Sequence, residues 1–340
     1  MTRVAINGLG RIGRAVLKII LNTSELELVA INEIIPLDNL AYLLKYDTVY
    51  GRYEKPVKSN NNNNNLIISC KKYQVFKEKD PIKLPWDDLD IDIVFECTGR
   101  FTKKEQLEKH LQAGSKNVIL SAPSKSEDIY TIVYGVNETP ESERMVSCAS
   151  CTTNCITPVV EVMGRRIGVK KAIMTTVHAY TSSQEIVDRP HKKFTRGRAA
   201  AANIVPTTTG AAIATAQVLT QYANKFDGAA IRVPVTVGSI ADITFVTERP
   251  TTVEEINNIF REETNNQRYQ DVLGVSQDPI VSSDIIQDPR ASIVDLSMTQ
   301  VVDSDLVKIM SWYDNEWGYA CQMVRQAQKM AKTSRPLQTV

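Results

Sequence analysis

Three cysteines lie close together in one short segment, VSCASCTTNCITP, which covers residues 146–158. Cys148, Cys151 and Cys155 fall within eight positions, so their thiols could bind a metal, form a disulfide or supply a nucleophile. A zinc site needs four ligands at defined spacings, whereas the C-x2-C-x3-C spacing here has no fourth ligand nearby. Six cysteines in 340 residues are too few for a disulfide scaffold. The segment therefore favours a nucleophile, and we expect no metal site.

Cys151 differs from the other two cysteines because it precedes Thr152-Thr153-Asn154, residues that can open a helix. Apolar residues from Val159 to Met163 continue that helix. A helix N-terminus and a neighbouring imidazole both lower the pKa of a thiol, and a fall from about 8.5 to about 6 makes it mostly thiolate at neutral pH. We therefore expect Cys151 to be a nucleophile with a lowered pKa, and Cys148 and Cys155 to be packing residues.

The candidate base for this thiol is His178, one of three histidines in the chain, in the segment TTVHAYTSSQ. A β-branched strand over residues 173–177 leads to His178, and hydroxyl-bearing residues follow it. A strand end that faces a helix start can bring an imidazole and a sulfur together. A lone histidine is often structural, but this position predicts a catalytic role for His178.

A glycine-rich turn near the N-terminus fits the pattern G-x-G-x-x-G at Gly8, Gly10 and Gly13. A short apolar strand precedes the turn, a helix follows it, and Glu33 closes the second strand twenty residues after Gly13. In this context the glycines allow a tight turn, a close approach of the backbone to a pyrophosphate and close packing of the helix. The turn therefore predicts a dinucleotide site. NAD is favoured over NADP, because a carboxylate at Glu33 binds ribose hydroxyls and repels a 2′-phosphate.

Two further segments have the composition of anion-binding sites. Arg196 and Arg198 precede Thr207-Thr208-Thr209-Gly210 and a helix that would start at Ala211. Threonine hydroxyls and helix-start N–H groups bind oxyanions, and arginine matches them with a planar fork. Arg232 stands in an otherwise apolar strand, AAIRVPV, where its charge needs either an anion or an internal carboxylate. These segments predict that the substrate carries a phosphate.

A dinucleotide, a reactive thiolate and a phosphorylated small substrate together indicate the oxidation of an aldehyde. Addition of a thiol to an aldehyde gives a hemithioacetal. Its alkoxide can release hydride to a nicotinamide and leave a thioester.

The elements that must position these groups follow from the hydrophobic pattern. Over the first 150 residues, helices from residue 11 and at 103–112 alternate with strands at 4–6, 26–32, 91–97 and 118–121. This alternation predicts an α/β fold with a Rossmann-type, doubly wound parallel sheet. The later pattern predicts an α+β domain with a mostly antiparallel sheet. Its helix is expected at 251–264 and its strands at 172–176, 231–237, 241–246, 292–296 and 306–312.

The composition is that of a globular protein, with 43% apolar and 23% charged residues. A formal net charge of +1 gives no overall basic field for nucleic acid. The N-terminus lacks the pattern of a secretory signal, and no segment reaches the roughly 20 apolar residues that span a bilayer. We therefore expect a cytoplasmic protein without a membrane or nucleic-acid partner. Residues 60–65 are six consecutive asparagines, which we expect to form a solvated loop.

Seven motifs make the chain resemble the phosphorylating glyceraldehyde-3-phosphate dehydrogenase family over nearly its whole length. They are AINGLGRIGR (5–14), LLKYDTVYGRY (43–53), ECTGRFT (96–102), SCTTNC (150–155), TTVHAYT (175–181), NIVPTTTGAA (203–212) and SWYDNEWGY (311–319). The resemblance implies NAD-dependent oxidative phosphorylation of glyceraldehyde 3-phosphate to 1,3-bisphosphoglycerate, in glycolysis and gluconeogenesis, through a hemithioacetal and a thioester.

The resemblance also implies a role for each matching residue. Cys151 would be the nucleophile, and His178 would activate it and later act as acid and base. The residues on NAD would be Gly8, Gly10, Arg11, Ile12, Gly13, Glu33, Lys79 and Ser121, with Asn315 on the nicotinamide amide. The substrate phosphate would lie on Thr181 and Arg232. The attacking inorganic phosphate, or the same anions in another state, would be bound by Ser150, Thr152, Arg196, Thr209 and Gly210.

Members of the family are usually homotetramers. A long loop over residues 180–205 would then reach a neighbouring subunit and help to shape its NAD site. The implied domains are residues 1–150 for NAD binding and 151–317 for catalysis. A C-terminal helix at 318–334 would pack back onto the first domain.

Three features depart from the family pattern. Glu33 replaces the more usual aspartate. Because glutamate also occurs at this position in erythrose-4-phosphate dehydrogenases, erythrose 4-phosphate is kept as an alternative substrate. Arg189 stands where a small or apolar residue is common and could tolerate the 2′-phosphate of NADP, although Pro190 favours NAD. The asparagine tract and the tail SRPLQTV (334–340) have no assignable role.

Two other classes of function fit part of the pattern. A cysteine hydrolase or acyltransferase would use Cys151 and His178 but would leave the glycine turn and Glu33 unexplained. A non-catalytic NAD-binding protein would have no need of Cys151 and His178. We therefore expect a dehydrogenase, which accounts for both sets of residues.

Overall fold

The computed structural model describes residues 1–333 of the chain, which divides into two compact units. Unit 1 contains residues 1–132 and 138–149, together with the described residues from 323 onward. Unit 2 contains residues 133–137 and 150–322. The last helix, α7 (Trp317–Thr333), begins in unit 2 and ends in unit 1, where Gln326 Nε2 donates to Thr139 Oγ1 (2.8 Å). Residue 334 of the expected helix and the rest of the tail lie outside the described residues.

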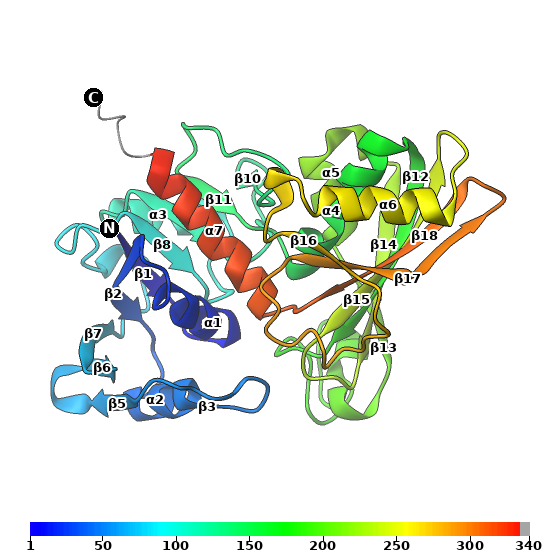
Figure 1. The fold of residues 1–340 in the computed structure, drawn as a ribbon. Helices are drawn as coiled ribbons and strands as arrows, with labels where there is room; N and C mark the ends of the chain where they lie inside the picture. Colours follow the sequence, from blue (N-terminus) through cyan, green and yellow to red (C-terminus); the bar gives the residue numbers. More distant parts are fainter. Residues whose placement is uncertain (334–340) are drawn as a thin grey trace. The chain divides into compact units, whose positions relative to one another are not determined.

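Unit 1 is built around a nine-stranded sheet in the order β10-β11-β9-β8-β1-β2-β7-β6-β5 (Figure 1). Neighbours from β10 to β7 pair in parallel, whereas the β7-β6 and β6-β5 pairs are antiparallel. The parallel, doubly wound sheet expected from the sequence is confirmed. Its strands are β1 (Thr2–Asn7), β2 (Leu26–Asn32), β5 (Val57–Asn60), β6 (Asn65–Ile68), β7 (Lys71–Phe76), β8 (Ile93–Glu96), β9 (Asn117–Leu120), β10 (Tyr130–Thr131) and β11 (Met145–Ser147).

Helices of unit 1 pack an apolar stripe onto this sheet. α1 (Arg11–Ile20) follows β1 after the glycine turn and buries Val16, Leu17 and Ile20, at the 3.6-residue spacing of a helix face. α3 (Lys104–Gln112) begins one residue later than expected and buries Leu107 and His110. The sequence pattern did not predict α2 (Leu37–Lys45) or the small hairpin of β3 (Tyr46–Asp47) and β4 (Gly51–Arg52).

The asparagine tract forms a hairpin at the edge of the sheet instead of a free loop. Asn60 ends β5, Asn65 begins β6, and the two residues pair across the strands. Asn64 has a left-handed φ of 49°, a conformation that asparagine tolerates better than most residues. The expectation of a solvated loop therefore holds only for the exposed turn, residues 61–64.

Unit 2 is built around a seven-stranded sheet in the order β13-β14-β12-β15-β18-β17-β16. Its pairs are antiparallel except for β12-β14 and β16-β17, so the mostly antiparallel sheet is confirmed. β14 ends before Pro234, which has no N–H for the ladder, so the strand expected at 231–237 starts and ends earlier. The strands are β12 (Val169–Ala179), β13 (Val205–Thr208), β14 (Phe226–Val233), β15 (Ser239–Thr247), β16 (Leu273–Ser276), β17 (Ser292–Val302) and β18 (Leu306–Tyr313).

Three helices pack on the sheet of unit 2 and enclose its core: α4 (Cys151–Arg166), α5 (Ala211–Val218) and α6 (Val253–Glu263). Side chains alternate along β12, so Met174, Thr176 and His178 are buried toward the helices while Lys171 and Ile173 are exposed. The parallel register of β12 and β14 pairs His178 with Arg232. Two residues far apart in the sequence are thereby fixed as neighbours.

Candidate active site

The sulfur of Cys151 and the ring of His178 meet in unit 2. Cys151 is the first residue of α4, and the side chain of Ser150 caps this helix by accepting a hydrogen bond from Thr153 N–H (3.1 Å). His178 is the second-last residue of β12, and it is 3% exposed. Sγ of Cys151 is 3.4 Å from Nε2 of His178, which is hydrogen-bonding distance for sulfur. The structure thus joins a nucleophile and a base that were predicted from separate patterns.

The other ring nitrogen of His178 faces an arginine. Nδ1 lies 2.7 Å from Nη1 of Arg232 and 2.6 Å from the carbonyl oxygen of Ala179, and that oxygen also accepts from Nη1 (2.9 Å). Arginine only donates, so Nδ1 accepts from Arg232 when it is unprotonated and donates to Ala179 when it is protonated. The two contacts of Nδ1 therefore require opposite protonation states, and Arg232 competes with the carbonyl for the tautomer of the base.

Burial, the charge of Arg232 and the more distant charge of Arg196 lower the pKa of His178 to about 3, against a smaller opposing effect of the Ala179 carbonyl. The ring of Tyr313 packs edge-on against the imidazole, with centroids 5.9 Å apart. His178 is therefore a neutral imidazole at neutral pH, and in this form it can accept a proton.

The thiol of Cys151 behaves differently from the expectation. Burial raises its pKa, and the positive charge of Arg232 and the hydrogen bonds from Thr152 and the helix-start backbone offset only part of that effect. The expected lowering of the pKa is therefore not found, because the cost of burying a thiolate exceeds the helix-start effect. Formation of a thiolate would therefore need a nearby proton acceptor, and the ring of His178 lies 3.4 Å from the sulfur.

All six cysteines are free thiols in the structure. Burial also raises the pKa of Cys148 and of Cys155 to about 12, in keeping with their expected role as packing residues. Within residues 1–333, no cluster of three or more His, Cys, Asp or Glu side chains could hold a metal ion.

Tyr313 joins the helix and the strand that carry the reactive pair. Its hydroxyl lies 2.8 Å from Thr152 Oγ1 on α4 and 2.8 Å from Thr176 Oγ1 on β12. Burial raises the pKa of Tyr313 well above its usual value, so the bridging group is a neutral hydroxyl. The sequence reasoning gave this tyrosine no role, although it lies in the SWYDNEWGY motif.

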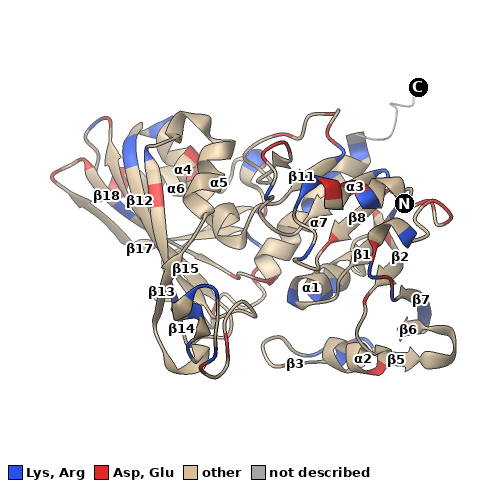
Figure 2. Cartoon of the chain, turned by 180° about the vertical axis from the view of Figure 1, so that it is seen from behind, with Lys and Arg blue, Asp and Glu red and all other residues tan. Residues whose placement is uncertain are grey.

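Arg232 and Arg196, two of the arginines expected to bind anions, lie close enough to His178 for their charges to act on its imidazole ring. Arg232 is half-buried, has no carboxylate partner among the described residues, and leaves its Nε without a hydrogen bond. Arg196 donates from Nε to Thr207 Oγ1 (3.0 Å), and burial together with the charge of Arg232 lowers its pKa. A half-buried arginine without a carboxylate partner, whose charge also destabilises a second arginine, is the pattern of a site for an anion. Figure 2 shows Lys and Arg residues on the loop beside β13 and β14.

Hydroxyls expected to bind phosphate are partly engaged within the protein. Ser150 Oγ is hydrogen-bonded to Thr153 Oγ1, and Thr152 Oγ1 is hydrogen-bonded to the hydroxyl of Tyr313. Thr181 Oγ1 contacts Ser183 Oγ (2.8 Å) on an exposed loop. Thr209 Oγ1 accepts from Ala211 N–H (3.2 Å), and Gly210 precedes α5 with open space where a side chain would be. The pair Thr209-Gly210 therefore presents a helix start, whereas Ser150 and Thr152 mainly hold α4 in place.

Unit 1 contains a cavity of about 510 Å³ at the glycine turn. It brings together Gly8, Gly10, Glu33 and Lys79 from the expected cofactor residues, and it adds residues that were not expected: Asn7, Asn32, Ile34, Ile35, Glu78, Cys97, Thr98, Arg100 and Phe101. Gly8 has a φ of +92°, and a Cβ on Gly13 would lie 2.0 Å from the carbonyl oxygen of Gly8. Both positions therefore require glycine, and Gly10, which is exposed between them, leaves backbone that a pyrophosphate can approach.

The remaining cofactor residues lie around this turn without lining the cavity. Arg11 and Ile12 open α1, and the guanidinium of Arg11 pairs with Asp47 (2.6 Å). Ser121 follows β9, where its N–H donates to the carbonyl oxygen of Glu96 (3.0 Å). Glu33 lines the cavity, and its Oε2 accepts from Leu9 N–H (2.7 Å), so the longer side chain reaches back to the turn.

Asn315, in unit 2, has a fixed carboxamide. Its Oδ1 accepts from Gly238 N–H (3.1 Å) and Ser239 Oγ (3.0 Å). These two bonds orient the amide, as a residue that recognises another amide requires.

Comparison with known proteins identifies both units of the chain. Residues 2–104 match the profile of the glyceraldehyde 3-phosphate dehydrogenase NAD binding domain, and residues 150–315 match that of its C-terminal domain. Three relatives carry the name glyceraldehyde-3-phosphate dehydrogenase. The protein from Thermotoga maritima is 49% identical over 329 residues, which cover 95% of this chain and 97% of the relative. The second protein of that name from Streptomyces avermitilis is 46% identical over 326 residues (95% and 96%), and the one from Clostridium pasteurianum is 45% identical over 342 residues (98% and 100%).

Proposed function

The chain belongs to the glyceraldehyde-3-phosphate dehydrogenase family, and from this premise we propose that it oxidises and phosphorylates glyceraldehyde 3-phosphate with NAD. As a member of this family it is an oxidoreductase with an NAD-binding domain. The observation that carries the proposal is the 3.4 Å contact between Cys151 Sγ and His178 Nε2, with Arg232 on the opposite ring nitrogen.

The first step is addition of Cys151 to the aldehyde carbon. In the neutral tautomer whose Nδ1–H donates to the Ala179 carbonyl, His178 Nε2 is unprotonated and takes the proton of the thiol as the carbon–sulfur bond forms. The imidazolium then stands beside the oxygen of the hemithioacetal and can exchange the proton with it. NAD, when bound, supplies the hydride acceptor that turns this adduct into a thioester.

The second step releases the product from Cys151. An oxygen of inorganic phosphate attacks the thioester carbon, the carbon–sulfur bond breaks, and the thiolate leaves as the acyl phosphate forms. Arg232 and Arg196 supply positive charge for the substrate phosphate and for the attacking phosphate, and Thr181, Thr209 and Gly210 supply donors. The charge of Arg232 lowers the pKa of Arg196, and this unfavourable effect supports the binding of an anion by these arginines.

The residues of unit 1 fit NAD. Gly8 and Gly13 leave no room for side chains between the turn and its neighbours, so backbone N–H groups can approach a pyrophosphate. Glu33 presents a carboxylate in the same cavity, which favours NAD over NADP. Asn315 is proposed to recognise the nicotinamide amide. Erythrose 4-phosphate stays as the alternative substrate, because Glu33 departs from the aspartate usual in the family.

One spectrophotometric assay tests this function. Purified protein with glyceraldehyde 3-phosphate, phosphate and NAD should produce absorbance at 340 nm, and Cys151→Ser should not. Cys148→Ser is the matched control and should keep the activity, since Cys148 is buried in unit 1. Parallel reactions with NADP or erythrose 4-phosphate decide the specificity. Reduced wild-type protein that gives no absorbance in any of these reactions would refute the proposal.

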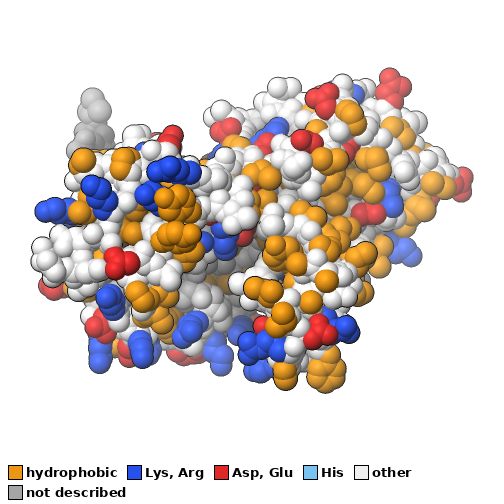
Figure 3. Space-filling view, turned by 90° about the horizontal axis from the view of Figure 1, so that it is seen from below, with side chains coloured by type: hydrophobic (Ala, Val, Ile, Leu, Met, Phe, Trp, Pro, Cys, Tyr) orange, Lys and Arg blue, Asp and Glu red, His pale blue; other side chains and the backbone are white. Residues whose placement is uncertain are grey.

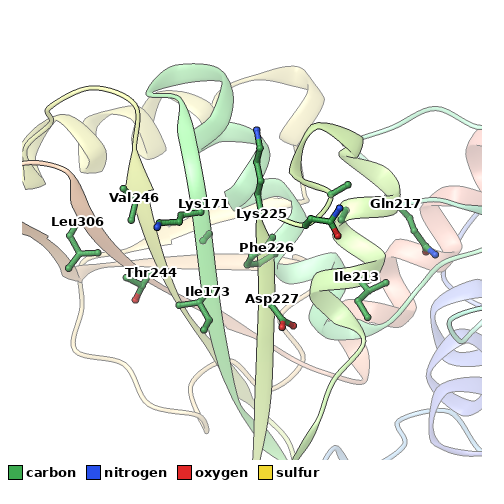
Figure 4. A pocket seen from close by; sticks show the side chains of 14 residues that line it. Lys171, Ile173, Ile213, Gln217, Lys225, Phe226, Asp227, Thr244, Val246 and Leu306 are labelled. Atoms are coloured by element: carbon green, nitrogen blue, oxygen red, sulfur yellow. The ribbon is translucent and has the colours of Figure 1, made fainter.

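We also propose that the protein assembles as a homotetramer. The loop over residues 180–205 exposes four large apolar side chains, Ile186 (84%), Val187 (68%), Phe194 (89%) and Ile204 (69%). Hydrophobic side chains also gather on the face seen in Figure 3. The sheet of unit 2 adds a cavity of about 840 Å³ beside Ile173, which is 62% exposed (Figure 4). Such uncovered apolar surface is typical of contacts between subunits.

The assembly is tested by light scattering after size exclusion. The double variant Ile186→Asp/Phe194→Asp should lower the mass from that of a tetramer, because it places charge in the proposed contact. Ile82→Asp, at an exposed apolar residue of unit 1, is the control and should leave the mass unchanged. A wild-type protein with the mass of a monomer would contradict the assembly.

Within the described residues, no helix is both long and apolar enough to cross a membrane. We propose the cytoplasm as the place where the protein acts, since its proposed substrate and cofactor belong to central carbon metabolism. Fractionation of cells that express the chain tests this.

A further inference from the structure

Unit 1 contains a polar cluster that none of the proposed steps uses. Trp86, Glu96 and His110 are each 0% exposed. They come from three places in the sequence, since Trp86 precedes β8, Glu96 ends β8 and His110 lies in α3. A buried carboxylate next to a buried histidine is costly unless every polar atom has a partner, so the cluster calls for an explanation.

Hydrogen bonds within the cluster run in one direction. The indole Nε1–H of Trp86 can only donate, and it lies 3.0 Å from Nδ1 of His110. Nδ1 must therefore accept, which leaves the ring proton on Nε2. This nitrogen lies 3.1 Å from Oε2 of Glu96 and donates to it. Trp86 thus selects the tautomer of His110 that can hold the carboxylate of Glu96.

Glu96 carries the connection from His110 toward the glycine turn. Its Oε2 also accepts from Asn7 Nδ2 (2.5 Å), and its Oε1 accepts from the N–H (2.8 Å) and the Oγ1 (2.5 Å) of Thr98. Asn7 in turn accepts from Asn32 Nδ2 (2.7 Å). With His110, four donors surround the carboxylate, and no lysine or arginine of the described chain pairs with it. The carboxylate is held by neutral donors of fixed direction.

Two of the residues held by Glu96 form part of the cofactor cavity. Asn7 and Thr98 both line the cavity, and Asn7 directly precedes Gly8 in the sequence. A Cβ on Gly8 would lie only 2.8 Å from the backbone nitrogen of Thr98, so the glycine turn rests directly on that residue. A shift of Thr98 by a few tenths of an ångström would therefore move the turn that receives the pyrophosphate.

We propose that His110 is a positioning residue for NAD, which acts through Glu96 to hold Asn7 and Thr98 against the glycine turn. The inference rests on the proposed use of NAD by this chain but concerns residues that touch neither the substrate nor Cys151. Loss of the His110 contact lets the carboxylate turn away from Thr98, and the cofactor then binds a turn that is no longer fixed. The chemistry at Cys151 and His178 in unit 2 stays unchanged.

The test compares two replacements of His110 in the full-length protein. His110→Leu removes both polar atoms. His110→Gln can keep them, because the oxygen and nitrogen of an amide are spaced like the two ring nitrogens, with the oxygen toward Trp86 and the nitrogen toward Glu96. Leu107→Ala, one turn earlier on α3 and also 0% exposed, is the matched control for loss of packing. NAD affinity is measured by calorimetry, the KM for NAD and kcat by assay, and stability by thermal unfolding.

His110→Leu should weaken NAD binding about ten-fold and raise the KM for NAD similarly, with kcat within about two-fold of wild type. His110→Gln should restore the affinity to within about two-fold, and Leu107→Ala should lower the unfolding temperature while leaving NAD affinity unchanged. Trp86→Phe keeps the packing but loses the donor, and it should weaken NAD binding about three-fold. This variant decides the question if His110→Leu fails to fold.

Equal loss of affinity in Leu107→Ala and His110→Leu would show that His110 only packs, and so would unchanged affinity in the folded His110→Leu or Trp86→Phe variants. Failure of the wild-type protein to bind NAD at all would instead refute the proposed function. Calorimetry of the wild-type protein is therefore run first, so that the two failures are distinguished.

Discussion

Nη1 of Arg232 and Nδ1 of His178 lie 2.7 Å apart on neighbouring parallel strands whose register pairs the two residues. The same arginine lowers the pKa of His178 and of Cys151, against a larger effect of burial on the thiol. Arg232 therefore acts on both Cys151 and His178, in addition to its proposed contact with the substrate phosphate. Binding of an anion to Arg232 would weaken its hold on Nδ1 and favour protonation of His178.

Removal of Arg232 should make Cys151 less reactive at a given pH. Because the positive charge lowers the pKa of the thiol, Arg232→Ala should shift the pH profile of Cys151 alkylation by iodoacetamide to higher pH. Arg198→Ala is the control, since Arg198 is 62% exposed and pairs with Asp188 at the surface. An unchanged profile in Arg232→Ala would show that its charge does not act on the thiol.

Tyr313→Phe should disturb the reactive pair without removing any reacting atom. The change leaves Thr152 and Thr176 without their shared hydroxyl partner, which costs about 1–3 kcal/mol for buried polar groups. We expect a lower unfolding temperature and a several-fold lower kcat, measured by calorimetry and the 340 nm assay. Tyr222→Phe, at a buried tyrosine beside Gly164, should leave kcat unchanged. If kcat is unchanged in both variants, Tyr313 does not support catalysis.

Glu33→Ala should weaken NAD binding and reduce the ratio by which the protein binds NAD more tightly than NADP. The carboxylate lines the cofactor cavity and holds Leu9 N–H, so its loss removes a ligand for the ribose and loosens the glycine turn. A rise of about ten-fold in the dissociation constant for NAD is expected. Glu27→Ala, on the strand β2 that ends one residue before Glu33, removes a carboxylate that pairs with Arg3 and Lys71, and it should not change the affinity for NAD or for NADP. Equal NAD and NADP affinities in the wild-type protein would contradict the role of Glu33.

The acid stability of unit 2 should depend on Glu263. Burial raises the pKa of this side chain, but Arg165 and Arg166 outweigh burial and hold it below the usual value. A lowered pKa stabilises the fold above the unfolded value near 4.5, and this stability is lost as the pH falls through the folded value. At pH 7, Glu263→Gln should lower the unfolding free energy by about 2 kcal/mol, which is less than for a fully buried ion pair because the two arginines are partly exposed. At pH 3, where the lost charge no longer matters, it should lower the unfolding free energy by almost nothing.

Glu262→Gln is the control for Glu263, since Glu262 is 63% exposed and pairs with Arg166 at the surface. It should lose less than about 1 kcal/mol at any pH. Chemical unfolding at several pH values measures both variants. A loss in Glu263→Gln that does not shrink in acid would show that shape, and not charge, makes Glu263 important.

The sequence predicted those parts of the site that are encoded in local patterns. The spacing of Gly8, Gly10 and Gly13 predicts the turn because only glycine fits positions 8 and 13. The helix start at Cys151 follows from Ser150 and the threonines after it. Both signals lie within a few residues of the feature that they specify.

Other parts of the site could not be predicted because they depend on contacts between distant segments. Tyr313 meets Thr152 across 161 positions, and the position of Arg232 beside His178 follows from the register of two strands. The raised pKa of Cys151 depends on burial by the whole core, which no local pattern reports. The cluster of Trp86, Glu96 and His110 was invisible for the same reason, since its members pair across 14 and 24 positions.

The most direct test of the account is to trap the acyl group on the protein. Wild-type enzyme is mixed with glyceraldehyde 3-phosphate and NAD without phosphate, quenched in acid, digested and examined by mass spectrometry. We predict one acyl group as a thioester on Cys151, which disappears when phosphate is added before the quench. Absence of an adduct from active protein, or an adduct on another residue, would contradict the assignment of Cys151 as the nucleophile.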